Sequence, residues 1–102
     1  MYIAIPIDNK DIKEAKITKM YNAVAWAIVE FDEGVIKNIS VAPSWQESGV
    51  DWLDFVVLEN RFENAFDFLN EGIVVLARRQ GQDSIEEIIE GFKFKELDEI
   101  GF

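Results

Sequence analysis

The pattern that most restricts the possible folds is a pair of alternating segments joined by a short turn. In AWAIVEF, residues 25–31, successive side chains alternate between two faces, so that Trp26 and Ile28 lie on the face opposite the alanines. VIKNISV, residues 35–41, alternates in the same way after the tripeptide DEG, which contains Gly34. A short glycine-containing connection between two such segments predicts an antiparallel β-hairpin.

Three further segments are almost continuously apolar: YIAIPI at 2–7, LDFVVL at 53–58 and IVVLA at 73–77. This composition is typical of strands that are covered on both faces. Polar or helix-like sequence separates the three segments. We therefore expect them to be central strands of a sheet that also contains the hairpin.

Two amphipathic helices are predicted after the second and third of these strands. Asn60 with Glu63, and Ser84 with Glu87, have the spacing of residues that cap the start of a helix, and Gly72 is placed to end the first helix. The apolar stripes are Phe62, Ala65, Phe66 and Leu69 in the first helix and Ile85, Ile88, Ile89 and Phe92 in the second. With right-handed crossovers, this order predicts an α/β fold with a mixed five-stranded sheet, an antiparallel hairpin plus parallel strands, and flanking helices.

The length of 102 residues fits one domain, which we place at 1–92, followed by a C-terminal tail at 93–102. Apolar residues of the tail, such as Leu97 and Ile100, stand among charged ones. The tail is expected to fold back as an extra edge or turn, and the alternative is a segment that docks on a partner.

Composition excludes several classes of chemistry. The chain contains no cysteine and no histidine, which removes disulfides, zinc sites built on sulfur or imidazole, and serine-histidine catalysis within the chain. A formal net charge of -10 disfavours nucleic acid and anionic membranes as partners. No signal peptide and no apolar segment long enough to cross a bilayer is recognisable, so we expect a cytoplasmic protein.

Polar and basic residues follow the predicted parallel strands and precede the hairpin. Since ligands of open α/β sheets collect beyond the carboxyl ends of parallel strands, these residues are candidates for one binding site. The candidate ligand-binding residues are Lys19, Asn22, Asn60, Arg61, Arg78 and Arg79. Helices beginning near Asn60 and Ser84 would add backbone N–H groups, which favour a small anion.

Other interpretations of the same residues stay open. The cations could simply offset the twenty carboxylates on a solvated surface. Asp8 and Glu59 could hold a divalent metal ion for hydrolysis, which would make the chain an enzyme. Trp45 and Trp52 could flank the site or could cover the core.

Several segments together resemble a known family. YIAIPID, AWAIVEFDEGVIKNISV, LDFVVL, AFDFLNEGIVVLA and SIEEIIEGF are similar, in order and spacing over about residues 1–92, to the dinitrogenase iron-molybdenum-cofactor biosynthesis family. These are small cofactor-carrier proteins related to the nitrogenase accessory factors. The resemblance implies a ribonuclease-H-like motif and a non-enzymatic role in binding or shuttling an iron-molybdenum or iron-sulfur cluster.

Two segments depart from that family's pattern. Family members enter the second strand through a His-Phe-Gly-Arg-like segment, where this chain has KMYN at 19–22. A glycine-rich turn follows the fourth strand in the family, where this chain has NRF at 60–62. Direct ligation of iron normally uses thiolate or imidazole, which this chain lacks.

We therefore expect a non-catalytic domain whose cluster pocket has been altered, and which binds a small anion or a protein partner, including a second copy of itself. The alternatives are the metal-dependent hydrolase that uses Asp8 and Glu59, and a purely structural interaction module. No metal ligand set is predicted.

Overall fold

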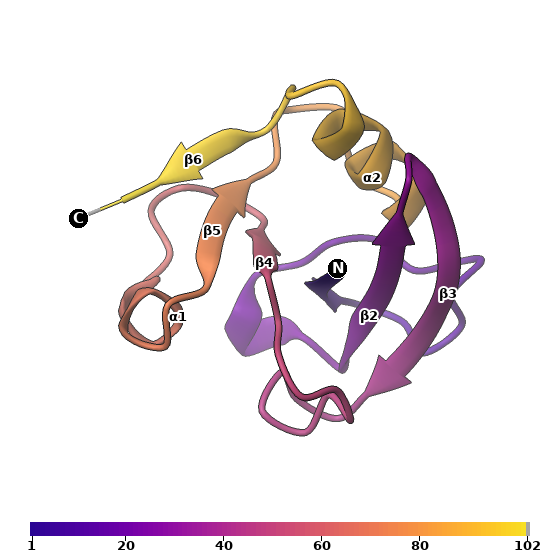
Figure 1. Cartoon of the computed structure of the whole chain (residues 1–102), viewed down its shortest axis with the longest axis horizontal. Helices are drawn as coiled ribbons and strands as arrows, with labels where there is room; N and C mark the ends of the chain where they lie inside the picture. Colours follow the sequence, from indigo (N-terminus) through magenta and orange to yellow (C-terminus); the bar gives the residue numbers. More distant parts are fainter. Residues whose placement is uncertain (102) are drawn as a thin grey trace.

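The computed structural model describes residues 1–101 and contains one six-stranded sheet with two α-helices (Figure 1). The strands are β1 (Tyr2–Ile7), β2 (Ala25–Asp32), β3 (Val35–Ala42), β4 (Phe55–Leu58), β5 (Val74–Ala77) and β6 (Asp98–Ile100). The helices are α1 (Phe66–Asn70), α2 (Ile85–Lys93) and a single 3-10 turn, η1 (Met20–Asn22).

The strands lie in the order β3-β2-β1-β4-β5-β6. β1, β4 and β5 run parallel, whereas β2, β3 and β6 are antiparallel to their neighbours. The predicted hairpin is confirmed as β2 and β3. Glu33 and Gly34 have φ values of 51° and 80°, which suits the tight turn whose twist matches that of the flanking strands.

The mixed α/β class is confirmed, but the expected count of five strands is wrong. The sixth strand comes from the tail, where Asp98–Ile100 pairs antiparallel with β5, and Val75 lies opposite Ile100. The tail therefore forms an edge of the sheet, one of the two outcomes expected for it. Only Ile100 is apolar within this strand, so the segment carries no alternation from which a strand could be predicted.

The two faces of the sheet carry two separate groups of buried side chains. One group joins Ile3, Ile5 and Ile7 of β1 to α2, and it includes Ala15 and Ile17 from the loop after β1. The other group lies beneath α1 and the segment 43–53. Its members include Trp26, Ile28, Val56, Leu58, Phe68 and Val75. The alternation predicted for 25–31 is confirmed, because its two sets of side chains enter opposite cores.

The helix predicted to begin at Asn60 is wrong in its start and in part of its buried stripe. α1 begins only at Phe66, and residues 60–64 form a turn in which Asn60 Oδ1 accepts a hydrogen bond from the N–H of Phe62 at 2.9 Å. Phe62 is 87% exposed and Phe66 is 56% exposed, whereas Phe68, outside the predicted stripe, is 2% exposed. Asn60 therefore caps a turn and not a helix.

The second predicted helix is confirmed as α2. Its capping box is complete: the Ser84 hydroxyl accepts from the Glu87 N–H at 3.1 Å, and the Glu87 carboxylate accepts from the Ser84 N–H at 3.0 Å. Ile85, Ile88 and Ile89 are buried.

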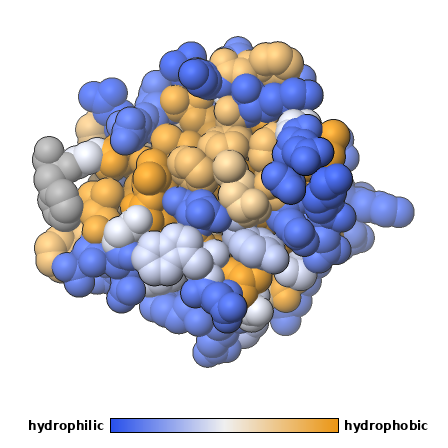
Figure 2. Space-filling model, viewed as in Figure 1, coloured by the Kyte–Doolittle hydropathy of each residue, from blue (hydrophilic) through white to orange (hydrophobic). Residues whose placement is uncertain are grey.

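The surface combines apolar and charged areas. Figure 2 shows hydrophobic residues gathered across the middle of one face, with hydrophilic residues around its outline. Neither of the helices in residues 1–101 has the length and apolar composition that a bilayer-spanning helix requires.

Candidate functional site

Three parallel strands end at the same edge of the sheet, after Ile7, Leu58 and Ala77. Because β2 is antiparallel to β1, it begins at this edge, and the Val24 N–H donates to the Ile7 carbonyl at 3.0 Å. We call this edge the carboxyl rim and define it as residues 8–9, 18–24, 59–64 and 78–84. The topology therefore brings the approach to the hairpin beside the loops that leave β4 and β5.

The carboxylate of Glu63 links two segments of the carboxyl rim. One oxygen accepts the Met20 N–H at 2.7 Å, and the other accepts the N–H groups of Glu59 and Asn60 at 3.1 and 3.3 Å. These donors come from two loops that are far apart in the sequence. Glu63 thus ties the approach to β2 to the turn after β4.

A hollow of about 420 Å³ lies next to this carboxylate. Its lining residues are Lys19, Met20, Tyr21, Asn60, Phe62, Glu63 and Asn64. Tyr21 and Phe62 are 82% and 87% exposed, so two aromatic rings border the opening. Lys19 and Asn60 are the two predicted ligand-binding residues that line this hollow.

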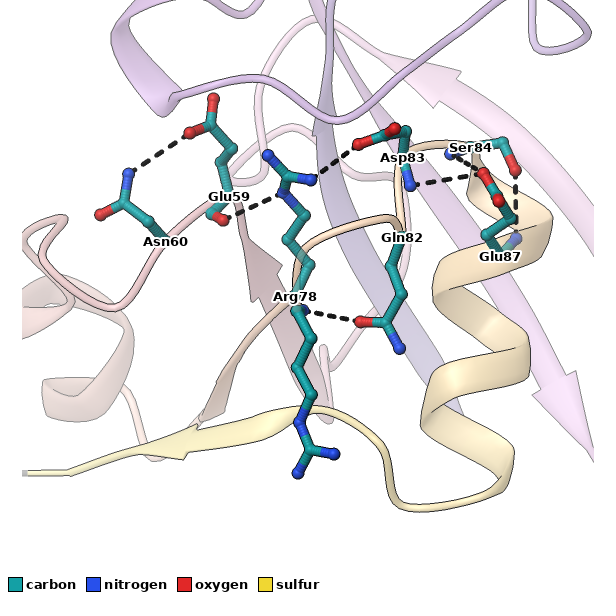
Figure 3. A network of polar contacts seen from close by, with 8 residues as sticks. Glu59, Asn60, Arg78, Gln82, Asp83, Ser84 and Glu87 are labelled. Atoms are coloured by element: carbon teal, nitrogen blue, oxygen red, sulfur yellow. Dashed lines mark hydrogen bonds and ion pairs between the residues drawn. The ribbon is translucent and has the colours of Figure 1, made fainter.

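Arg78 lies at the same rim but is engaged in a polar network. Its Nε donates to the Glu59 carbonyl at 3.2 Å, and its Nη1 pairs with Asp83 Oδ1 at 2.7 Å. Figure 3 shows the guanidinium lying between Glu59 and Asp83. Arg78 therefore joins the end of β4 to the loop before α2.

The remaining predicted residues differ in their surroundings. Arg79 Nε pairs with Asp98 of β6 at 3.2 Å, so its side chain is engaged with the edge strand. The guanidinium of Arg61 lies over the Phe62 ring, 5.6 Å from its centroid. Asn22 is exposed at the end of η1. Within residues 1–101, Lys19 and Arg61 form no ion pair.

The start of α2 offers fewer free N–H groups than the sequence led us to expect. The capping box uses the N–H groups of Ser84 and Glu87, and the Asp83 N–H also donates to the Glu87 carboxylate at 3.4 Å (Figure 3). The bonds from the backbone and hydroxyl of Ser84 and from the backbone of Asp83 lower the pKa of Glu87 below its ordinary value. A negatively charged side chain of the protein therefore already occupies this helix start.

The carboxylates considered for a metal site also have protein partners. Asp8 Oδ1 accepts the Lys16 N–H at 2.9 Å, and Glu59 Oε1 accepts from the Asn60 side chain at 3.4 Å. In the part of the chain that the structure describes, no three carboxylate, imidazole or thiolate side chains are grouped as a metal site would require.

The two loop tryptophans lie away from the carboxyl rim. Trp45 and Trp52 line a hollow of about 300 Å³ together with Asp51, Glu71 and Ile73. We call it the amino-end hollow, because Leu53 and Ile73, which precede β4 and β5, also line it. Trp45 in addition covers the core, with its ring centroid 4.7 Å from that of Phe68.

The sequence did not identify Glu63 as part of the site. Its spacing from Asn60 is a visible signal, but the same spacing is typical of a helix cap. The hydrogen bond to Met20, 43 residues away, depends on the strand order and has no local signal.

No protein-family model matches the sequence, and no curated protein matches it. Solved structures do match. A candidate dinitrogenase from Methanocaldococcus jannaschii has a TM-score of 0.75 at 18% identity, over 99% of this chain and 95% of that one. A candidate NifB protein from Thermotoga has a TM-score of 0.71 at 21% identity, over 96% of this chain and 91% of that one.

These likenesses agree with the resemblance found in the sequence, because these two matching structures are described as a dinitrogenase and a NifB protein. At these identities, the finding concerns the fold. The chain has the fold of proteins described in this way.

Proposed function

We propose that this chain is a non-catalytic, cytoplasmic, carrier-like domain that binds a small anionic ligand at the carboxyl rim. The proposal adopts the role and the ribonuclease-H-like motif implied by the sequence resemblance. The observation that carries it is the hollow lined by Lys19 and Asn60, which lies where open α/β sheets bind ligands.

Charge at this hollow supports an anion in spite of the net charge of -10. Lys19 lines the hollow, Arg61 follows Asn60, and neither cation forms an ion pair within residues 1–101. Among the described residues that line the hollow, the one carboxylate is that of Glu63, which is held by backbone N–H groups. The exposed rings of Tyr21 and Phe62 provide an apolar border for the body of a ligand.

A metal cluster as cargo would have to be held without direct ligation of iron by cysteine or histidine. The chain has neither residue, and the carboxylates of Glu59 and Glu63 are hydrogen-bonded within the rim. The residues present therefore fit an anion held by charge and N–H donors better than they fit a cluster bonded to the protein.

The test is calorimetric titration of the protein with inorganic phosphate and with molybdate, together with tryptophan fluorescence. The variant Lys19→Ala/Arg61→Ala is expected to weaken binding about tenfold or more, because it removes two charged groups from the site. A matched control is Lys37→Ala/Lys93→Ala, which removes the same charge from β3 and the end of α2. The control should bind as the wild type does.

Two results would overturn the proposal. One is the absence of binding by any of these anions to the wild-type protein. The other is an equal loss of affinity in the rim variant and in the control variant, which would mean that only the overall charge matters.

A further inference from the structure

The Glu63 carboxylate has more partners than a turn requires. Its bonds to the N–H groups of Glu59 and Asn60 are local, spanning four and three residues, as in a capping box. The third bond, to the Met20 N–H, spans 43 residues and is the shortest of the three at 2.7 Å. Local turn chemistry accounts for the first two bonds and not for the third.

Together, the three N–H groups form a cradle that holds both oxygens of one carboxylate. The Met20 N–H donates to one oxygen, and the N–H groups of Glu59 and Asn60 donate to the other. Any small ion with two oxygens that share a negative charge could receive the same three hydrogen bonds. The occupant here is supplied by the protein itself, from the turn that also carries Arg61 and Phe62.

We propose that Glu63 is an internal stand-in for a ligand's carboxylate or phosphate, and that the ligand displaces it from the N–H groups of Met20, Glu59 and Asn60. This inference rests on the proposed function and specifies how the same rim recognises and admits its ligand. When Glu63 leaves, the link between the approach to β2 and the 60–64 turn is broken. The turn is then free to move with its exposed Phe62, while Lys19 remains beside the incoming anion.

Competition with a tethered carboxylate reduces the apparent affinity for a free anion. If Glu63 occupies the cradle at least nine-tenths of the time, its removal strengthens the apparent affinity about tenfold or more. The effective concentration of a side chain on a short tether is at least on the order of millimolar. Weak binding by the wild-type protein and tighter binding by a Glu63 variant is therefore the signature of this arrangement.

The experiment is a titration of ¹⁵N-labelled protein with sodium acetate and with sodium phosphate, followed by amide NMR at constant ionic strength. In Glu63→Ala, the amide signals of Met20, Glu59 and Asn60 should move together, with an apparent affinity at least tenfold tighter than in the wild-type protein. Glu63→Gln is the matched variant, because it keeps an acceptor oxygen but loses the charge. Its apparent affinity for the anion should lie between those of the wild-type protein and Glu63→Ala.

Acetate and phosphate also separate two kinds of ligand. A larger response to acetate identifies a carboxylate ligand, and a larger response to phosphate identifies a phosphate-bearing one. Either response supports displacement of Glu63 if the amide signals of Met20, Glu59 and Asn60 shift in the wild-type protein.

A second measurement does not depend on the stability of Glu63→Ala. In the wild-type protein, the ¹³C signal of the Glu63 carboxylate should shift towards that of a solvated carboxylate as the anion is added. The inference is overturned if the wild type and Glu63→Ala bind with equal affinity, or if the shifted amides lie elsewhere. If binding at the carboxyl rim persists in that case, the proposed function stands, whereas shifts confined to residues outside the rim would reject the proposed function as well. Absence of binding to every variant would instead reject both.

Discussion

The two ends of the parallel strands are built differently, although the same strands form both. At the carboxyl rim, side chains cross between loops: Glu63 reaches Met20, and Arg78 reaches both Glu59 and Asp83. At the amino ends, the corresponding link is the Asp54 carboxylate, which accepts the N–H of Tyr2 at 2.8 Å. The carboxyl rim is therefore fixed by polar contacts to a greater extent than the amino ends.

The charges at the two hollows also differ. The hollow at the carboxyl rim is lined by Lys19 and Glu63, whereas the described residues that line the amino-end hollow include Asp51 and Glu71 and no lysine or arginine. On this distribution of charge, an anion is repelled less at the first hollow than at the second, in keeping with the function proposed above. In a strongly acidic protein, the local distribution of a few cations thus distinguishes two openings that otherwise both offer aromatic walls.

The largest expected change in the free energy of unfolding comes from a substitution in the core between the two ends of the strands. Phe68 packs between Trp26, near the carboxyl rim, and Trp45, at the amino-end hollow, with ring centroids 6.1 and 4.7 Å away. Phe68→Ala should reduce the free energy of unfolding by about 3–5 kcal/mol, because it removes a fully buried ring and leaves a cavity. Urea denaturation followed by fluorescence measures the change.

Phe62→Ala is the matched control for this experiment, since Phe62 is 87% exposed. Its effect should be below about 1 kcal/mol. Equal effects of the two substitutions would show that Phe68 does not join the two ends through the core.

The second prediction compares how much the polar contacts at each end of the strands contribute to the free energy of unfolding. Glu63→Ala leaves three backbone N–H groups without their acceptor and should reduce the free energy of unfolding by about 1–3 kcal/mol. Asp54→Ala removes the acceptor of one N–H group and should reduce it by about 1 kcal/mol. Urea denaturation of both variants under identical conditions checks the order. A greater loss for Asp54→Ala would reverse our comparison of the two ends.

The predictable parts of this structure are those that local patterns determine. The hairpin followed from alternation and Gly34, and α2 followed from the spacing of Ser84 and Glu87 together with its apolar stripe. Both depend on residues within a few positions of one another. The meeting of strand ends at one rim also followed, since parallel strands with crossovers allow few other arrangements.

The parts that could not be predicted depend on contacts between distant segments. The spacing of Asn60 and Glu63 is compatible with a helix cap and with the observed turn. In the turn, Glu63 also accepts the Met20 N–H, and the sheet is what brings these two residues together. β6 is a strand because β5 offers an open edge, not because its own sequence alternates. Arg78 and Arg79 are adjacent in the sequence, yet they pair with different elements.

A third prediction concerns the pH dependence of the capping box at the carboxyl rim. Because the folded state lowers the pKa of Glu87, this group stabilises the fold above its unfolded pKa, and the contribution is lost as the pH falls through the folded pKa. A ¹³C NMR titration should give a midpoint below the ordinary value for glutamate. In Ser84→Ala, the loss of the hydroxyl donor should move the pKa of Glu87 part of the way back upward. An unchanged midpoint in that variant would show that the hydroxyl of Ser84 does not contribute.

The smallest change in the free energy of unfolding is expected for a substitution between the carboxyl rim and the edge strand β6. Arg79 and Asp98 form an ion pair at 3.2 Å, but their side chains are 52% and 46% exposed. Solvent screens such pairs, so Arg79→Ala should change the free energy of unfolding by less than about 1 kcal/mol. Amide hydrogen exchange of Val75 and Ile100 is a more sensitive measurement, because local opening of β6 from β5 exposes this pairing without global unfolding. If β6 is held mainly by its backbone pairing with β5, exchange will be nearly unchanged in Arg79→Ala. If exchange instead becomes much faster, the pairing of β6 depends on this ion pair. The polar contacts that stabilise the carboxyl rim would then also stabilise the C-terminal strand.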